Sequence, residues 1–188
     1  MNKRVQKALD YTEEMYLGIY KMQGRFRSID HIKACHQQTL HHLSREEVVS
    51  DLGINLQIIV ILHDILEDFP DQLHYIINNF GLNITRSILA LTQDPQATKE
   101  DAWAHSIRQL DKEKWEVKQA KIFDTLDNLR LYNSVDPEEV HSKYIQKAMH
   151  YYLPLAKVLN EPEIHNQAKR LINRHIQVLQ RGANSYGT

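Results

Sequence analysis

Apolar residues recur along this chain mostly three and four positions apart, which is the spacing of one face of a helix. Glycine and proline are scarce, at six and five of 188 residues, so few positions interrupt the pattern. No segment alternates convincingly between apolar and polar residues over the length of a strand. The pattern therefore predicts an all-α bundle of about eight to ten helices with no sheet.

Caps and helix breakers set the expected helix boundaries. The predicted helices cover residues 2–22, 30–42, 44–53, 55–69, 72–80, 83–93, 101–110, 113–132, 136–160 and 163–181, with a loop at 94–99. Ser44 and Glu47 form a capping box, Pro70 stops one helix and Gly81 ends the next. No linker separates these helices, so we expect a single domain over residues 1–188, with the last few residues disordered.

The helix expected over 55–69 is apolar on most sides, yet its end carries four ionisable residues. Residues four apart share a helix face, so His63 stacks with Glu67 and Asp64 stacks with Asp68. Such groups on a buried helix are costly unless they are paired or bind a cation. An imidazole with carboxylates suits manganese, iron, zinc or magnesium. The alternative is a solvated acidic helix end with a hydrogen-bonded His63.

A metal site on this helix needs further ligands from other segments. His31 lies just inside a predicted helix in RSIDHIKACH, and Asp124 lies among apolar residues in AKIFDTLDNLR. An aspartate flanked by core residues requires a partner. Each residue also has an ordinary interpretation, His31 as a polar residue of a first turn and Asp124 as the ion-pair partner of Lys121 or Arg130.

Taken together, these residues resemble a known signature. His31, the pair His63-Asp64 and then Asp124 match in order the H…HD…D pattern of the HD-domain metal-dependent phosphohydrolases. The stretch LHDILED is similar to the HDxxED form found in RelA/SpoT-type alarmone (ppGpp) hydrolases and in their small stand-alone relatives.

The resemblance extends along the chain. KIFDTLDNLR is similar to the family segment K-L-A-D-R-x-x-N-(M/L)-R, with Lys121, Asn128 and Arg130 in register. Phe80-Gly81 followed by ILALTQD, and later LPLAKVL, match two further family segments in the family's order. Collinear matches therefore cover roughly the first 160 residues, and the ordered set is far more specific than an HD pair alone.

The resemblance implies an all-α HD-domain fold and one bound Mn²⁺, with other divalent ions possible. The implied metal ligands are His31, His63, Asp64 and Asp124. It further implies that two carboxylates act on the water: Glu67 exchanges the proton, and Asp68 orients the water or the other carboxylate.

The resemblance also implies the substrate and its contacts. In the family the reaction removes pyrophosphate from the 3′ position of guanosine 3′,5′-bis(diphosphate). The expected substrate-binding residues are Lys21, Lys121, Asn128 and Arg130, because phosphate groups need cationic partners.

The segment before His31 departs from the family pattern. Tyr16 replaces a histidine, and Lys21 stands for the arginine that packs against guanine, although lysine lacks arginine's flat, forked group. The interval from His31 to His63 is longer than usual, so His36 is an alternative first ligand. Another nucleotide or phosphoester as substrate, or a non-catalytic nucleotide-binding or scaffold role, therefore stays open.

Charge and cysteine content limit the expected binding partners and the expected cellular compartment. The chain has 23 lysines and arginines against 24 aspartates and glutamates, so no basic field indicates a nucleic-acid partner. A single cysteine excludes an internal disulfide framework and fits a reducing compartment. No stretch has the composition of a signal peptide or a membrane span. We expect a cytoplasmic hydrolase whose partner is a small phosphorylated nucleotide.

Overall fold

The computed structural model describes residues 1–21, 26–92, 108–132, 149 and 162–185. The predicted loop at 94–99 and most of the predicted helices at 101–110 and 136–160 lie outside these residues. The contacts divide the chain into two compact units, Met1–Phe123 and Asp124–Thr188, and each is described by itself. The expectation of one domain stays a prediction.

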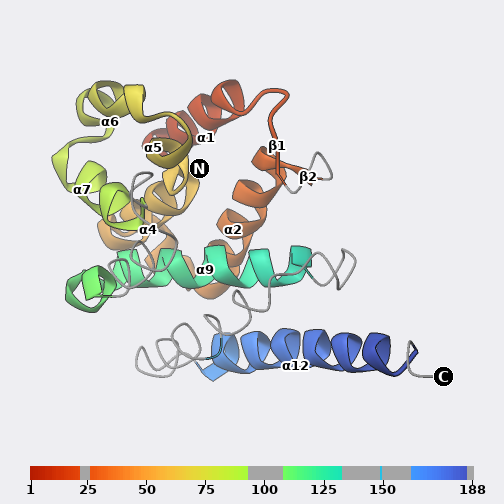
Figure 1. Ribbon diagram of the computed structural model, residues 1–188. Helices are drawn as coiled ribbons and strands as arrows, with labels where there is room; N and C mark the ends of the chain where they lie inside the picture. Colours follow the sequence, from red (N-terminus) through yellow and green to blue (C-terminus); the bar gives the residue numbers. More distant parts are fainter. Residues whose placement is uncertain (22–25, 93–107, 133–148, 150–161, 186–188) are drawn as a thin grey trace. The chain divides into compact units, whose positions relative to one another are not determined.

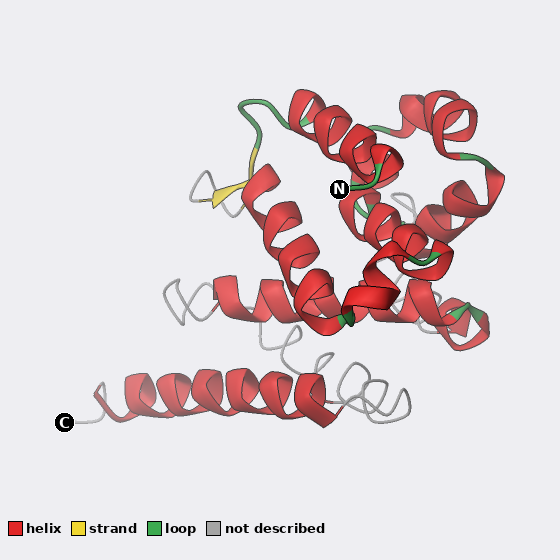
Figure 2. Cartoon of the chain, turned by 180° about the vertical axis from the view of Figure 1, so that it is seen from behind, coloured by secondary structure: helices red, strands yellow, loops and turns green. Residues whose placement is uncertain are grey.

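The described parts of the chain are almost entirely helical, which confirms the predicted all-α class (Figures 1 and 2). Several predicted boundaries also hold. The Ser44–Glu47 capping box is present at the start of α3 (Arg45–Val49), and α6 (Leu73–Phe80) ends at Gly81. Pro70 opens a short 3-10 turn, Pro70–Gln72, before α6.

Helix α4 (Asp51–Leu62) is the centre of the first unit, because it packs against four other helices. These are α1 (Lys3–Met15), α2 (Ser28–His42), α3 and α7 (Leu82–Leu91). Every residue from Leu56 to Leu62 is buried. A helix covered on several sides needs apolar residues around most of its circumference, which explains the nearly unbroken apolar run before His63.

Helix α9 (Trp115–Tyr132) contains the boundary between the two units. Within the first unit it lies beside α2, because the Cys35 thiol donates a hydrogen bond to the Phe123 carbonyl over 3.6 Å and the rings of His42 and Phe123 meet edge to face. In the second unit the described residues also include α12 (Pro162–Ser185), whose Ala168 and Ile172 are buried.

The first helix is shorter than predicted, and a small sheet follows it. Helix α1 ends at Met15 rather than at residue 22, and Gly18 adopts a φ of 76°, in the left-handed region that glycine tolerates best. The chain then forms a two-stranded antiparallel ribbon, β1 (Tyr20–Lys21) with β2 (Phe26–Arg27). Alternation over two residues is too short to be read from a sequence, so the prediction of no sheet missed this ribbon.

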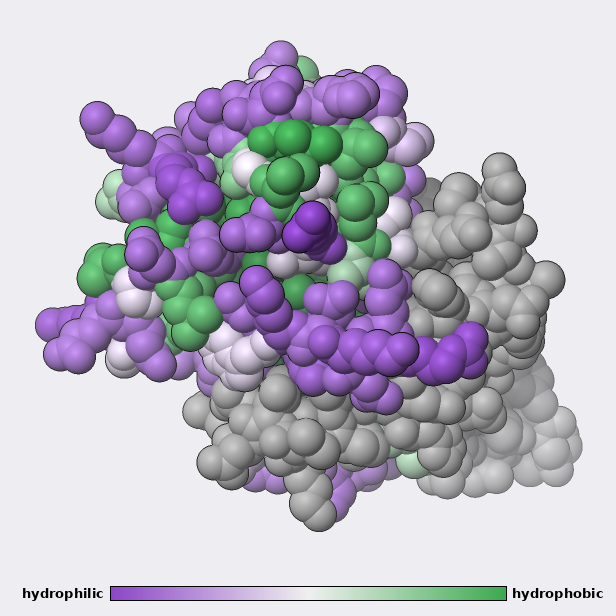
Figure 3. Space-filling model, turned by 90° about the vertical axis from the view of Figure 1, so that its left-hand side faces the viewer, coloured by the Kyte–Doolittle hydropathy of each residue, from purple (hydrophilic) through white to green (hydrophobic). Residues whose placement is uncertain are grey.

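The surface carries both hydrophilic and apolar regions. Figure 3 shows apolar side chains gathered on one face and bordered by hydrophilic ones. Among the described helices, none combines the length and the apolar run needed to cross a membrane.

Gly53 gives a direct test of the packing between α3 and α4. The predicted helix boundary near Gly53 is wrong, because α3 ends at Val49 and Gly53 lies in the first turn of α4. A Cβ atom at Gly53 would lie 1.9 Å from the Glu47 carbonyl oxygen. Alanine normally stabilises a helix relative to glycine by about 1 kcal/mol. Here we expect Gly53→Ala to lower the free energy of unfolding by about 1–3 kcal/mol, measured by urea denaturation.

The matched control is Leu52→Ala, one residue earlier on the same helix and 52% exposed. Its effect should stay within about 0.5 kcal/mol. A Gly53→Ala protein as stable as the parent would contradict the close contact.

Candidate metal centre

The predicted helix over 55–69 is interrupted at the histidine–aspartate pair. Helix α4 ends at Leu62, His63 and Asp64 form a turn, and α5 (Ile65–Asp68) follows. The Asp64 carbonyl accepts hydrogen bonds from the backbone N–H groups of Glu67 and Asp68, over 3.1 and 3.0 Å. The break keeps His63 on the buried end of α4 while α5 carries Glu67 and Asp68 into exposed positions.

Two imidazole rings meet at this turn. His31 of α2 and His63 are 2% and 4% exposed, and their Nε2 atoms lie 3.3 Å apart. The His63 Nδ1 lies 2.7 Å from the Val60 carbonyl oxygen, which can only accept, so Nδ1 carries the proton. When the ring is neutral, the lone pair is on Nε2, where it could bind a metal ion; when the ring is protonated, Nε2 donates to the Asp64 carboxylate. A fixed tautomer of this kind is typical of a metal-binding histidine.

Asp64 adds a carboxylate beside the rings. Its Oδ1 lies 3.2 Å from the His63 Nε2, and its Oδ2 accepts a hydrogen bond from the Lys21 ammonium. Burial alone would raise the pKa of Asp64, but the charge and hydrogen bond of His63, followed by the charge of Lys21, hold it well below its usual range. Asp64 is therefore an ionised carboxylate at neutral pH.

Asp124 follows Phe123 directly in α9 and is 5% exposed. The Asn128 amide, one helical turn later, donates a hydrogen bond to its Oδ1. Buried histidines and aspartates of this kind could hold a divalent metal ion, and Asp124 as one of the ligands stays a prediction.

The spacing of the donors fits a divalent cation. Bonds of about 2.1 Å from one ion, at angles between octahedral and tetrahedral, separate two ligand atoms by about 3.0–3.4 Å. The separation of the His31 and His63 nitrogens is 3.3 Å, and that of the His63 nitrogen and the Asp64 oxygen is 3.2 Å. Two imidazoles with carboxylates form a donor set that manganese, iron and zinc accept.

Glu67 and Asp68, the two carboxylates that follow His63 and Asp64 in the sequence, lie beside the candidate metal ligands and are not among them. Glu67 and Asp68 are exposed on α5, and the Asp68 Oδ2 accepts a hydrogen bond of 2.7 Å from the hydroxyl of the buried Tyr16. Sequence reasoning noted Tyr16 only as a replacement for histidine. The contact could not be read from the sequence, because 52 positions separate the two residues.

The other predicted site residues have partners of their own. Lys21, predicted to contact substrate, pairs with Asp64. Arg130 pairs with Asp127 rather than with Asp124, and its guanidinium nitrogen lies 3.3 Å from the Asp127 Oδ1. Lys121 is partly buried on α9. His36, the alternative first ligand, is turned to Gln57, with its Nε2 3.3 Å from the amide oxygen.

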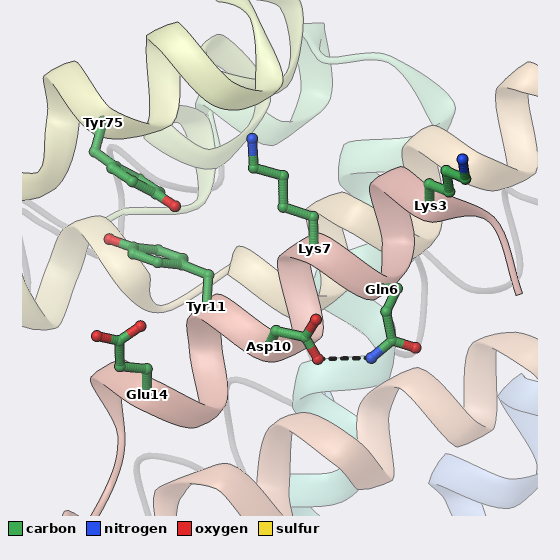
Figure 4. Close-up of a pocket in the computed structure, with 7 residues that line it drawn as sticks. All are labelled: Lys3, Gln6, Lys7, Asp10, Tyr11, Glu14 and Tyr75. Atoms are coloured by element: carbon green, nitrogen blue, oxygen red, sulfur yellow. Dashed lines mark hydrogen bonds between the residues drawn. The ribbon is translucent and has the colours of Figure 1, made fainter.

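A surface groove of about 340 Å³ lies between α1 and α6, away from the predicted residues. Figure 4 shows Tyr11 and Tyr75 stacked in it, with ring centroids 4.4 Å apart. None of the predicted metal or catalytic residues lines this groove. The chemistry that the sequence predicts therefore belongs to the turn after α4 and not to this groove.

Comparison with known proteins gives a match in fold. No protein-family model matches the chain, and no curated protein matches its sequence. One solved structure is similar over 96% of both chains, with a TM-score of 0.63 and 16% sequence identity. That protein is described as a metazoan ortholog of SpoT that hydrolyzes ppGpp and plays a role in starvation responses. At this identity the likeness shows that the two chains share a fold.

The position of His36 predicts a pH effect on stability. Burial lowers the pKa of His36, and the hydrogen bond to Gln57 only partly opposes this shift. As the pH falls below about 6.5, the unfolded chain takes up a proton that folded His36 resists, so stability is lost on acidification and is fully present above that pH. We expect the free energy of unfolding to fall less steeply between about pH 7 and 5 in His36→Gln than in the parent.

Chemical denaturation at several pH values measures this slope. His41→Gln, at an exposed position of the same helix, is the control and should keep the parent's slope. Identical slopes for His36→Gln and the parent would contradict a buried, neutral His36.

Proposed function

We propose that the chain is a metal-dependent phosphohydrolase of the HD type. The observation that carries the proposal is the meeting of two buried imidazoles and an ionised carboxylate at the end of α4, beside two exposed carboxylates. Binding or scaffolding alone would not need that exposed pair. The likeness in fold to a protein described as hydrolysing ppGpp is a further support.

The proposed metal ligands are His31, His63, Asp64 and Asp124, with Mn²⁺ as the expected ion. When bound, a divalent cation at these residues would supply Lewis acidity, which lowers the pKa of water and polarises phosphate oxygens. Asn128 would orient the Asp124 carboxylate through the hydrogen bond between them, as residues behind metal ligands commonly do.

Glu67 and Asp68 would handle the proton of the attacking water. Both lie one helical turn beyond the candidate ligands, and both are exposed, so water and substrate can reach them. Glu67 would accept the proton, and Asp68 would orient the water. The water oxygen would form a bond to phosphorus while the bond from phosphorus to the leaving 3′ oxygen breaks, and the proton that Glu67 accepts would be returned to that oxygen.

The proposed substrate is guanosine 3′,5′-bis(diphosphate), which would lose pyrophosphate from its 3′ position. Its phosphates need cations, and Lys21, Lys121 and Arg130 are the candidates. Lys21 supports this role because its ammonium is already at the edge of the candidate metal site. Asn128 would contribute to substrate binding through its place beside Asp124.

A second candidate, the same chemistry on another nucleotide or phosphoester, is favoured by Lys21 itself. A lysine paired with Asp64 does not offer the flat guanidinium surface that stacks on a purine ring. Purified protein with Mn²⁺ should therefore be offered guanosine 3′,5′-bis(diphosphate) together with a panel of nucleotides. Selective pyrophosphate release from the alarmone supports the first candidate. If the protein hydrolyses other phosphoesters and not the alarmone, the second candidate replaces the first.

Asp64 is proposed as a metal ligand and Glu67 as a proton acceptor, so removing each side chain should have a different effect on metal binding and on turnover. Asp64→Ala should lose bound Mn²⁺ and activity together. Glu67→Ala should keep Mn²⁺ affinity within about twofold of the parent, while kcat falls about 10²–10⁴-fold, the usual contribution of a general acid or base. Calorimetric titration with Mn²⁺ and steady-state rates measure both quantities.

Glu46→Ala, which removes an exposed glutamate from α3, is the matched control and should leave both quantities unchanged. A Glu67→Ala protein as active as the parent would overturn the role of Glu67. An Asp64→Ala protein that still binds Mn²⁺ with the parent's affinity would overturn the metal site.

A further inference from the structure

Tyr16 connects the buried core to the exposed carboxylate of Asp68. It follows directly after α1, is 1% exposed, and donates its hydroxyl to the Asp68 Oδ2 over 2.7 Å. Its ring meets the Phe69 ring edge to face, with centroids 5.2 Å apart and planes at 72°. The ring is therefore fixed by packing, and only its hydroxyl reaches the carboxylate at the end of α5.

The Tyr16 hydroxyl donates to Asp68 and is protonated at neutral pH. Burial raises the pKa of Tyr16 far above its usual range, and the charge of Asp64 and the hydrogen bond to Asp68 raise it further. The phenol therefore keeps its proton at neutral pH. It cannot accept a proton from the reaction, so its effect on Asp68 is one of position.

The hydrogen bond uses one of the two carboxylate oxygens. Among the residues that the structure describes, Tyr16 is the one hydrogen-bond partner of the Asp68 side chain. A donor on Oδ2 restricts the orientation of the carboxylate and leaves Oδ1 for water or substrate. An exposed aspartate without such a donor would sample several rotamers.

We propose that Tyr16 is a positioning residue for the hydrolytic reaction: its hydroxyl holds Asp68 in the one orientation that serves the attacking water. The inference rests on the proposed phosphohydrolase function. Tyr16 does not touch substrate or metal in this role, and it acts through Asp68 alone. Removing its hydroxyl must therefore change turnover without changing metal affinity.

The experiment is a double-mutant cycle on the full chain with Tyr16→Phe, Asp68→Ala and the combined variant. The rates are measured with Mn²⁺ and guanosine 3′,5′-bis(diphosphate), or with the nucleotide of the panel that the parent hydrolyses. We expect Tyr16→Phe to lower kcat about 10- to 100-fold, the effect of a misplaced reacting group, with KM and Mn²⁺ affinity within about twofold of the parent. In the Asp68→Ala background the same change should have no further effect on kcat.

Tyr11→Phe is the matched control, because Tyr11 lies on α1, just before Tyr16, and also donates its hydroxyl, to Gln72 over 3.0 Å. It should leave kcat unchanged. A second measurement, urea unfolding of the metal-free variants, reports the contact independently of activity: the effects of Tyr16→Phe and Asp68→Ala on stability should be non-additive.

The outcomes separate the two levels of the proposal. Suppose that the parent is active and that Tyr16→Phe leaves kcat unchanged, or lowers it equally in the parent and in the Asp68→Ala background. Either result overturns the positioning role of Tyr16 and leaves the phosphohydrolase proposal standing. A parent that binds Mn²⁺ but hydrolyses nothing in the panel overturns the proposed function and the positioning role with it, even where the unfolding data show the contact.

Discussion

The meeting of two buried histidines and a partly buried aspartate at the end of an apolar helix is the constraint on which the rest of this structure depends. The His63 Nε2 lies 3.3 Å from the His31 Nε2 and 3.2 Å from the Asp64 Oδ1, where α4 leaves the core. Polar groups removed from water in this way cost free energy unless they bond to one another or to an ion. Neighbouring residues offset part of this free-energy cost. The Val60 carbonyl oxygen accepts a hydrogen bond from the His63 Nδ1, and the Lys21 ammonium forms an ion pair with the Asp64 carboxylate.

The same constraint explains why the neighbouring segments are irregular. The chain breaks its helix at His63 and Asp64, which leaves the carboxylates of α5 exposed beside the buried histidines. After α1, the turn at Gly18 and the short ribbon bring Lys21 back to Asp64, while Tyr16 stays in the core against Phe69. Local irregularity in this part of the fold thus serves to arrange chemical groups, whereas the regular helices supply the packing.

Periodicity predicted the parts of the structure that packing decides. The all-α class, the burial of α4 and the capping box at Ser44 follow from patterns within a few residues, and the structure confirms them. It did not predict the break at His63, the ribbon, or the pairing of Lys21 with Asp64. The ribbon has strands of two residues, too short for a pattern, and the pair of Lys21 and Asp64 joins residues 43 positions apart, which no local propensity encodes. The order of the metal-ligand candidates could be found because it resembles a family signature. The hydrogen bond from Asn128 to Asp124 joins residues four apart on one helix, so helical spacing allows it.

The central claim is that one divalent ion binds between the two buried histidines. Pulsed electron paramagnetic resonance of the Mn²⁺-loaded protein tests it most directly, because the method detects nitrogen nuclei bonded to the ion. We predict a nitrogen signal from two imidazoles, reduced in His31→Ala and in His63→Ala and unchanged in His36→Ala. Bound Mn²⁺ that shows no imidazole nitrogen, or a signal that disappears with His36 instead, would contradict the proposed centre.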